Sequence, residues 1–82
     1  MHTQKYKSHI DSDGSDAISS FSKWAKLNKI QMVVVYDGTS DIWSVTFADP
    51  HSDIVILGQR QDQSLSSAVY GAFTAAKAHI KP

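Results

Sequence analysis

Apolar side chains recur every three or four positions between residues 64 and 81, which is the spacing of one face of an α-helix. The positions are Leu65, Ala68, Val69, Ala72, Phe73, Ala76 and Ile80. Ser64 precedes them as the expected N-cap, because its hydroxyl can accept a hydrogen bond from a free N–H of the first turn. The pattern therefore predicts an amphipathic helix at the end of the chain.

A second helix is expected from the Asp- and Ser-rich residues 11–16 to about Asn28. Such short side chains cap helix starts, and acidic groups favour the positive end of the helix dipole. The apolar face of this helix is formed by Ala17, Ile18, Phe21, Trp24 and Ala25. Residues 1–12 have a weak pattern and are expected to form a flexible arm or a short extra strand.

Three strands are expected between the helices. Residues 31–36 form a β-branched run, residues 42–48 alternate apolar with polar positions, and residues 54–58 are apolar. The Asp-Gly pair in residues 37–41 is typical of a hairpin turn, whereas the polar residues 59–63 are interpreted as a loop into the last helix. The strands therefore follow one another as an antiparallel meander.

This order predicts an α+β fold, a two-layer α-β-β-β-α sandwich with a three-stranded antiparallel sheet and two helices on one face. Residues 1–82 make a single domain, because a chain of 82 residues has no room for a second core. The expected core is made of Phe21, Trp24, Val45 or its strand neighbours, Leu65, Val69 and Phe73.

The first and third strands are apolar on both faces. Since two helices cover one face of the sheet, the outer face is expected to hold Val33, Val35, Ile54 and Ile56, or the alternate set of positions. A face of this kind is normally covered, either by the N-terminal arm or by a partner chain, as in a homodimer. Both alternatives are open at this stage.

Cysteine is absent, which excludes a disulfide framework and a thiolate zinc site. A small domain without disulfides favours a reducing compartment, and the polar N-terminal residues do not have the pattern of a signal peptide. The expected location is therefore the cytoplasm. Eight basic side chains balance eight acidic ones, so the electrostatic footprint of a nucleic-acid binder is missing. Neither nucleic acid nor a membrane is the expected partner.

All eight acidic residues are aspartate. The meander brings the first helix start, the first hairpin loop and the loop into the last helix to one end. Those segments hold one cation, Arg60, and six aspartates: Asp11, Asp13, Asp16, Asp37, Asp41 and Asp62. The opposite end gathers Lys23, Lys26, Lys29, Lys77 and Lys81 against Asp49 and Asp53. The aspartates are interpreted mainly as turn and helix caps, and alternatively as a surface that binds a basic protein.

Candidate reactive groups are few. Asp49, His51 and Asp53 are interpreted as a turn rather than a metal site, because no second ligand cluster accompanies them. Residues 11–16 lack the glycine and glutamate spacing of a calcium loop. We therefore expect neither an enzyme nor a cofactor or metal.

The topology of residues 15–81 resembles the double-stranded RNA-binding domain. In that family the first hairpin loop and the start of the last helix contact RNA. The matching positions here are residues 37–41 and 63–67, and none of them is Lys or Arg. The resemblance implies the fold and, as an alternative function, nucleic-acid binding.

In size, lack of cysteine and acidic loops, the chain also resembles small accessory proteins of phages and mobile elements. Among these, anti-CRISPR and similar inhibitors act by docking on a host protein. The function expected from this resemblance is a non-enzymatic protein-binding module that inhibits a host defence complex through its acidic loops. The alternatives are a nucleic-acid-binding domain of the resembled topology and a small homodimeric structural or adaptor protein.

Overall fold

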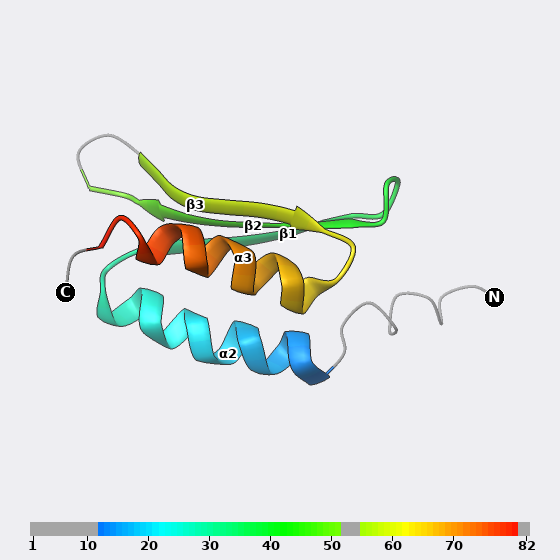
Figure 1. Ribbon diagram of the computed structural model, residues 1–82, viewed down its shortest axis with the longest axis horizontal. Coiled ribbons are helices and arrows are strands. Elements are labelled where there is room, and N and C mark those ends of the chain that lie inside the picture. The colour runs from blue at the N-terminus through cyan, green and yellow to red at the C-terminus, as the bar shows by residue number, and fades with distance from the viewer. Residues whose placement is uncertain (1–11, 52–54, 81–82) are drawn as a thin grey trace.

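The element order α-β-β-β-α is confirmed by a computed structural model, which describes residues 12–51 and 55–80 (Figure 1). The elements are α2 (Ser12–Leu27), β1 (Gln31–Asp37), β2 (Ile42–Asp49), β3 (Val55–Asp62) and α3 (Leu65–Lys77). The N-terminal arm, Asp11, Asp53 and Lys81 lie outside the described residues. None of the described helices combines the length and the apolar character needed to cross a membrane.

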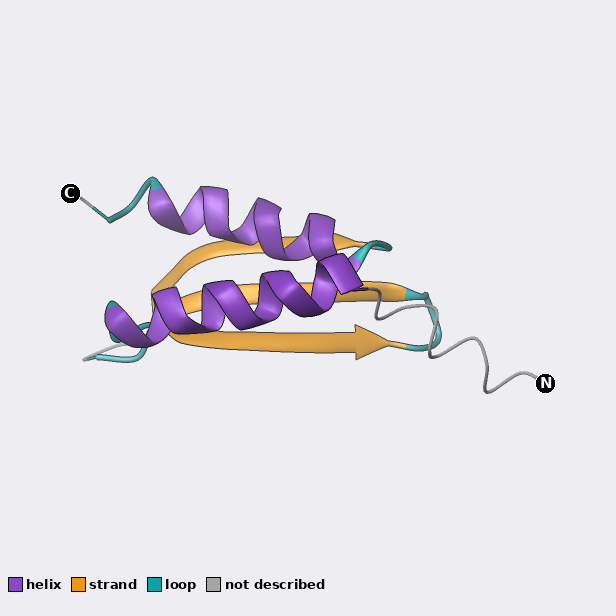
Figure 2. Cartoon of the chain, turned by 90° about the horizontal axis from the view of Figure 1, so that it is seen from below, coloured by secondary structure: helices purple, strands orange, loops and turns teal. Residues whose placement is uncertain are grey.

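The three strands form one antiparallel sheet in the order β1-β2-β3. Val34 lies opposite Val45, and Val45 lies opposite Arg60. Both helices run along one face of the sheet, α3 nearer to β3 and α2 nearer to β1 (Figures 1 and 2). The expected two-layer sandwich with one helix-free sheet face is thus confirmed.

The core lies between this sheet face and the helices. Its largest fully buried side chains are Phe47, Leu65, Val45 and Val69. Burial alternates along β2 because successive side chains of a strand point to opposite faces. The sequence pattern predicted Val45 or one of its strand neighbours in the core without choosing among them. In the structure, Val45 and its neighbour Phe47 are both fully buried.

Three expected core aromatics, Phe21, Trp24 and Phe73, are only partly buried and form the contact between the two helices. The Phe73 ring centroid lies 4.3 Å from that of Phe21 and 4.9 Å from that of Trp24. Trp24 also meets Phe47 edge to face at 5.5 Å, which joins this aromatic contact to the sheet.

The third strand is longer than the sequence pattern indicates. Residues 59–62, interpreted as part of a loop, continue β3 in register with β2, from Gln59 opposite Thr46 to Asp62 opposite Trp43. A register shift lies beside Phe47 and Ala48, so that Leu57 is an extra residue in β3. The second half of this edge strand is polar and is held in the sheet by backbone pairing with β2.

The last helix ends at Lys77, four residues before the expected limit. The amides of His79 and Ile80 donate to the carbonyls three residues earlier, at 3.0 and 3.1 Å, which is the bonding of a tighter 3₁₀-type turn. Ile80, the last apolar position of the helical pattern, therefore lies in a turn beyond the helix, where it is half-buried.

Candidate functional site

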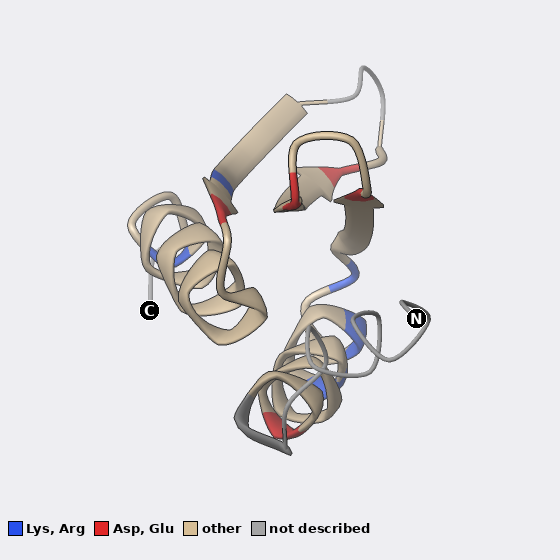
Figure 3. Ribbon diagram, turned by 90° about the vertical axis from the view of Figure 1, so that its right-hand side faces the viewer, with Lys and Arg blue, Asp and Glu red and all other residues tan. Residues whose placement is uncertain are grey.

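The end of the molecule that carries the starts of both helices also carries the β1–β2 hairpin loop and the end of β3 (Figure 1). We call this the acidic end and define it by its four described aspartates, Asp16, Asp37, Asp41 and Asp62. Figure 3 looks onto it and shows acidic positions on the hairpin, at the end of β3 and on α2. Asp13 lies within α2, but its side chain is outside the described part of the chain, as is all of Asp11.

Three aspartates close the turns that follow the strands in the same way. Asp37 accepts a hydrogen bond from the amide of Thr39, Asp49 from that of His51, and Asp62 from that of Ser64. Each donor–acceptor distance is 2.9 Å. A side chain that binds the backbone two residues ahead fixes a tight turn. The capping interpretation of the aspartates is therefore confirmed at these positions.

Hydrogen bonds to the Asp37 carboxylate hold its pKa below the ordinary value of 3.8. The amide of Thr39 contributes most, followed by the Ser40 hydroxyl. Hydrogen bonds that favour the charged form lower the pKa of a carboxyl group. Asp37 thus stays ionised at the tip of the hairpin while its side chain remains exposed.

Asp41, just before β2, forms a hydrogen bond with Tyr36 of β1 across the same hairpin. The Tyr36 hydroxyl donates to Asp41 Oδ1 at 2.8 Å, and the Tyr36 ring packs 4.8 Å from the ring of Trp43. Asp41 has φ of 58°, a left-handed conformation that Asp and Asn tolerate better than most residues. The loop is thus fixed by side chains at both ends.

Arg60 Nη2 lies 3.9 Å from Asp62 Oδ2, and the Arg60 side chain is 57% exposed. An ion pair this long and this exposed adds little stability. Arg60 is not in a loop, as the sequence suggested, but on the helix-facing side of β3, where its aliphatic stem lies against Gly71 of α3. Its guanidinium partly offsets the acidic end without covering it.

The opposite end of the molecule is basic. Lys26 and Lys77 occupy the last turns of the two helices, where a positive charge complements the helix dipole. Lys29 follows α2 at φ of 57°, and Asp49 lies in the turn after β2. The two ends of the described chain thus differ in sign although the net charge is zero.

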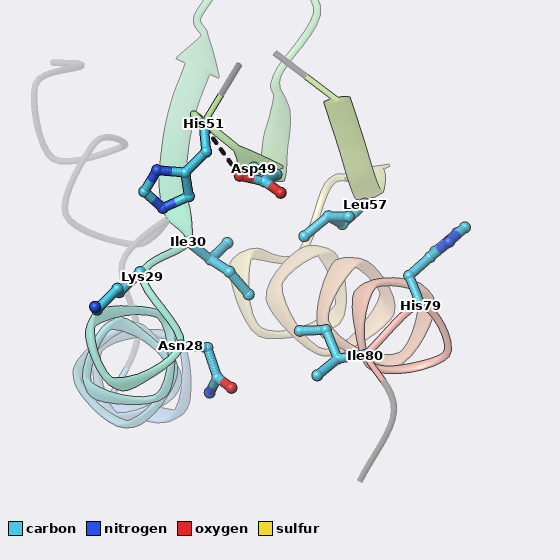
Figure 4. Close-up of a pocket in the computed structure, with 8 residues that line it drawn as sticks. All are labelled: Asn28, Lys29, Ile30, Asp49, His51, Leu57, His79 and Ile80. Atoms are coloured by element: carbon cyan, nitrogen blue, oxygen red, sulfur yellow. Dashed lines mark hydrogen bonds between the residues drawn. The ribbon is translucent and has the colours of Figure 1, made fainter. Parts of the chain in front are cut away.

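An open hollow of about 290 Å³ lies at the basic end (Figure 4). Ile30, Leu57 and Ile80 converge on it, whereas Lys29 and His79 project outward. The remaining lining residues are Asn28, Asp49 and His51. Asp49 binds the backbone of His51 and not its ring, so these two residues form no acid–base pair. Within the described ranges, no three His, Asp, Glu or Cys side chains gather as metal ligands.

The outer sheet face carries the first of the two residue sets that the sequence left open. Val33, Val35 and Ile56 are 38%, 52% and 55% exposed, and Ile54 lies outside the described residues. Val33 and Val35 lie at the β1 edge opposite Thr46 and Ser44 of β2, whereas Ile56 lies at the β3 edge opposite Ala48. The polar side chains of Ser44 and Thr46 therefore border the two valines on the sheet side, and the valines and Ile56 are on opposite edges.

The positions that would contact RNA in the resembled family lie together at the acidic end. They include Asp37 and Asp41 in the hairpin, and the cap formed by the Ser64 hydroxyl and the amide of Ser67. An acidic hairpin repels phosphate groups, which carry the affinity in nucleic-acid complexes. The element order agrees with the resemblance, but the charge on this surface does not.

Comparison with known proteins gives no match: no family model, no curated protein and no solved structure is significantly similar to this chain.

Sequence reasoning missed two features of the acidic end. The first is the hydrogen bond from the Tyr36 hydroxyl to Asp41. The sequence signal that could have indicated it is a tyrosine near the end of a strand with an aspartate five residues later. The second is the indole N–H of Trp43, which is buried without a hydrogen-bond partner. Trp43 is one of the strand neighbours of Val45 that the sequence offered for the core, but the sequence gives no sign that its indole N–H lacks a hydrogen-bond partner.

Proposed function

We propose that this chain is a non-enzymatic protein-binding module that docks through its acidic end on a basic surface of its partner. The observation that supports this proposal is the convergence of Asp16, Asp37, Asp41 and Asp62 from different elements at one end. Lysines occupy the other end. This asymmetry gives the neutral chain a preferred direction of approach to a basic surface.

The hairpin is suited to docking because it is ordered before contact. Its two aspartates are held by Thr39 and Tyr36. A loop that is already fixed loses less conformational entropy on binding. The hydrogen bonds that lower the pKa of Asp37 favour its charged form.

The setting that we propose is inhibition of a host defence complex by a phage or mobile-element protein, in the manner of an anti-CRISPR inhibitor, within the cytoplasm. This part of the proposal rests on the resemblance in size and composition, and the partner would be a host protein with Lys and Arg on its surface. Duplex RNA is the competing ligand, and its binding is one outcome of the test below.

The test removes charge and keeps structure. Asn can accept the same backbone hydrogen bonds as Asp, and it tolerates a left-handed conformation. The triple variant Asp37→Asn, Asp41→Asn and Asp62→Asn therefore loses three charges while its turns stay closed. Asp49→Asn is the matched control, because Asp49 closes the same kind of turn at the basic end.

Tagged wild-type and variant chains are used to capture partners from a bacterial lysate, and binding of the purified partner is then measured at several salt concentrations. We expect the triple variant to associate about tenfold more slowly at low salt and to lose most of the salt dependence, since charges at a rim act on association. Asp49→Asn should bind as the wild type does. Equal binding by the triple variant, or a gel shift of duplex RNA that the wild type produces and the triple variant strengthens, would contradict the proposal.

A further inference from the structure

The β1 strand is an open edge of the sheet. It pairs with β2 on one side, and among the described residues nothing lies along its other side (Figure 2). An edge strand presents a row of backbone N–H and C=O groups that can pair with another strand. Natural proteins usually protect such edges with charged residues, proline, a bulge or a covering segment.

The two edges of this sheet differ in protection. β3 carries a bulge at Leu57 and a charged residue, Arg60, within the strand. β1 has seven residues, and the six from Gln31 to Tyr36 include neither charge, proline nor glycine. Val33 and Val35 stand exposed on its outer face. Of the two edge strands, β1 is therefore the one without these protective features.

We propose that β1 pairs antiparallel with β1 of a second copy of this chain, across a two-fold axis at Val34, to form a continuous six-stranded sheet. In this register Val33 lies opposite Val35 of the second copy, Met32 opposite Tyr36, and Gln31 opposite Asp37. Every β1 residue thus meets a partner of similar character. A two-fold axis requires such self-complementarity, and β-branched pairs across strands are favourable.

The charges also suit this register. Asp37 is the only residue of β1 that is charged at neutral pH, and the axis places its two copies at opposite ends of the ladder. Beyond the strand, the antiparallel arrangement places the basic end of one copy, which holds Lys29, beside the hairpin of the other, which carries Asp37. Like charges directly opposite would oppose pairing, but here opposite charges approach each other. The zero net charge adds no long-range repulsion between copies.

This inference goes beyond the proposed function, because it concerns the side of the sheet and names a second copy as occupant. It also differs from stacking of the outer sheet faces. Stacking would bury Ile56 together with the valines, whereas edge pairing leaves Ile56 at the far edge of each sheet.

The test measures the mass of the chain in solution by light scattering and sedimentation. We expect twice the chain mass of 9.0 kDa. The variant Val33→Lys with Val35→Lys should weaken self-association by roughly tenfold or more, since it replaces both Val33–Val35 pairs across the axis. Ile56→Lys is the matched control: the same change at an equally exposed position of the same face, on the other edge. It should leave the dimer intact.

A covalent test is independent of how the Lys variant folds, and the chain has no natural cysteine to interfere. With Val33→Cys and Val35→Cys together, oxidation should give a disulfide-linked dimer. Either cysteine alone should not, because each faces the other position across the axis. A monomeric wild type, a dimer that survives the double Lys change, a dimer that Ile56→Lys breaks, or single-cysteine variants that cross-link as well as the double one would each overturn the proposal.

Discussion

At the scale of single residues, the aspartates of this chain have structural roles before any other. Asp37, Asp49 and Asp62 each bind the amide two residues ahead, and Asp41 holds Tyr36. Replacing Asp37 and Asp41 with Lys, the obvious way to reverse the charge, would therefore also open the hairpin. Asn is the substitution that separates charge from structure.

The Asp37 carboxylate should make the protein less stable in acid. Its folded-state pKa lies below the unfolded value because its hydrogen bonds favour the charged form. The stabilisation is thus present above the unfolded pKa and is lost as the pH falls through the folded pKa. We expect the melting temperature of the wild type to fall as the pH drops below 3.8, and that of Asp37→Asn to fall less steeply.

Thermal melts followed by circular dichroism across this acidic range check the expectation. Asp49→Asn serves again as the comparison for a turn of the same geometry. If Asp37→Asn and the wild type lose stability in parallel over the whole range, the hydrogen bonds from Thr39 and Ser40 do not favour the charged form of Asp37 as described.

At the scale of elements, the contact between β3 and α3 depends on Gly58. A Cβ at this position would overlap with the carbonyl oxygen of Ala72 and the amide nitrogen of Ala76, and would lie 3.0 Å from the Cα of Ala76. These are backbone atoms of α3, which can give way only if the whole helix moves. The absence of a side chain at Gly58 therefore lets the helix lie directly on the strand.

Gly58→Ala should lower the free energy of unfolding by about 3 kcal/mol or more, because it overpacks a rigid contact. Gly71→Ala is the matched control. Its new Cβ meets Arg60 Cγ at 2.8 Å, but that side chain is exposed and can swing away. Since Ala is also the better helix former, Gly71→Ala should change the stability by less than about 1 kcal/mol. Chemical denaturation of both variants measures these free energies of unfolding. A similar loss of stability in the two variants would contradict this account of the contact between β3 and α3.

The sequence predicted the elements well where an apolar pattern marked them. The alternation Trp43-Val45-Phe47 and the helical spacing of Leu65, Val69 and Phe73 gave the sheet face and the helix that covers it. Polar residues 59–62 gave no such signal, because an edge strand with one exposed face is stabilised by backbone pairing and needs few apolar side chains. The extra residue at Leu57 also shifts the pattern, so simple alternation fails there.

The candidate site was predictable in location but not in detail. Topology alone placed Asp16, Asp37, Asp41 and Asp62 at one end, because successive antiparallel elements alternate in direction. The bond from Tyr36 to Asp41 and the turn made by Asp62 depend on side-chain conformation, which a sequence pattern does not contain. A sequence pattern likewise does not show that the buried indole N–H of Trp43 lacks a hydrogen-bond partner.

At the scale of the whole molecule, two surfaces of different character lie at one end of the molecule and along the side of the sheet. The acidic end is polar, ordered and charged, whereas the β1 edge offers valines and backbone groups. Antiparallel pairing at β1 would direct the acidic ends of two copies in opposite directions. A dimer of this kind could hold two basic partners, or two sites of one assembly, which strengthens binding through effective concentration.

The central claim is that the acidic end binds a basic protein surface, and mapping that contact by nuclear magnetic resonance tests it most directly. Isotope-labelled chain is titrated with the captured partner, and the backbone amide shifts are followed residue by residue. We expect the largest changes at residues 38–41, at Asp62 to Ser64 and in the first turns of α2 around Asp16, all weakening as salt rises. Changes that gather instead on Lys26, Lys29 and Lys77, or on Val33, Val35 and Ile56, would contradict the claim.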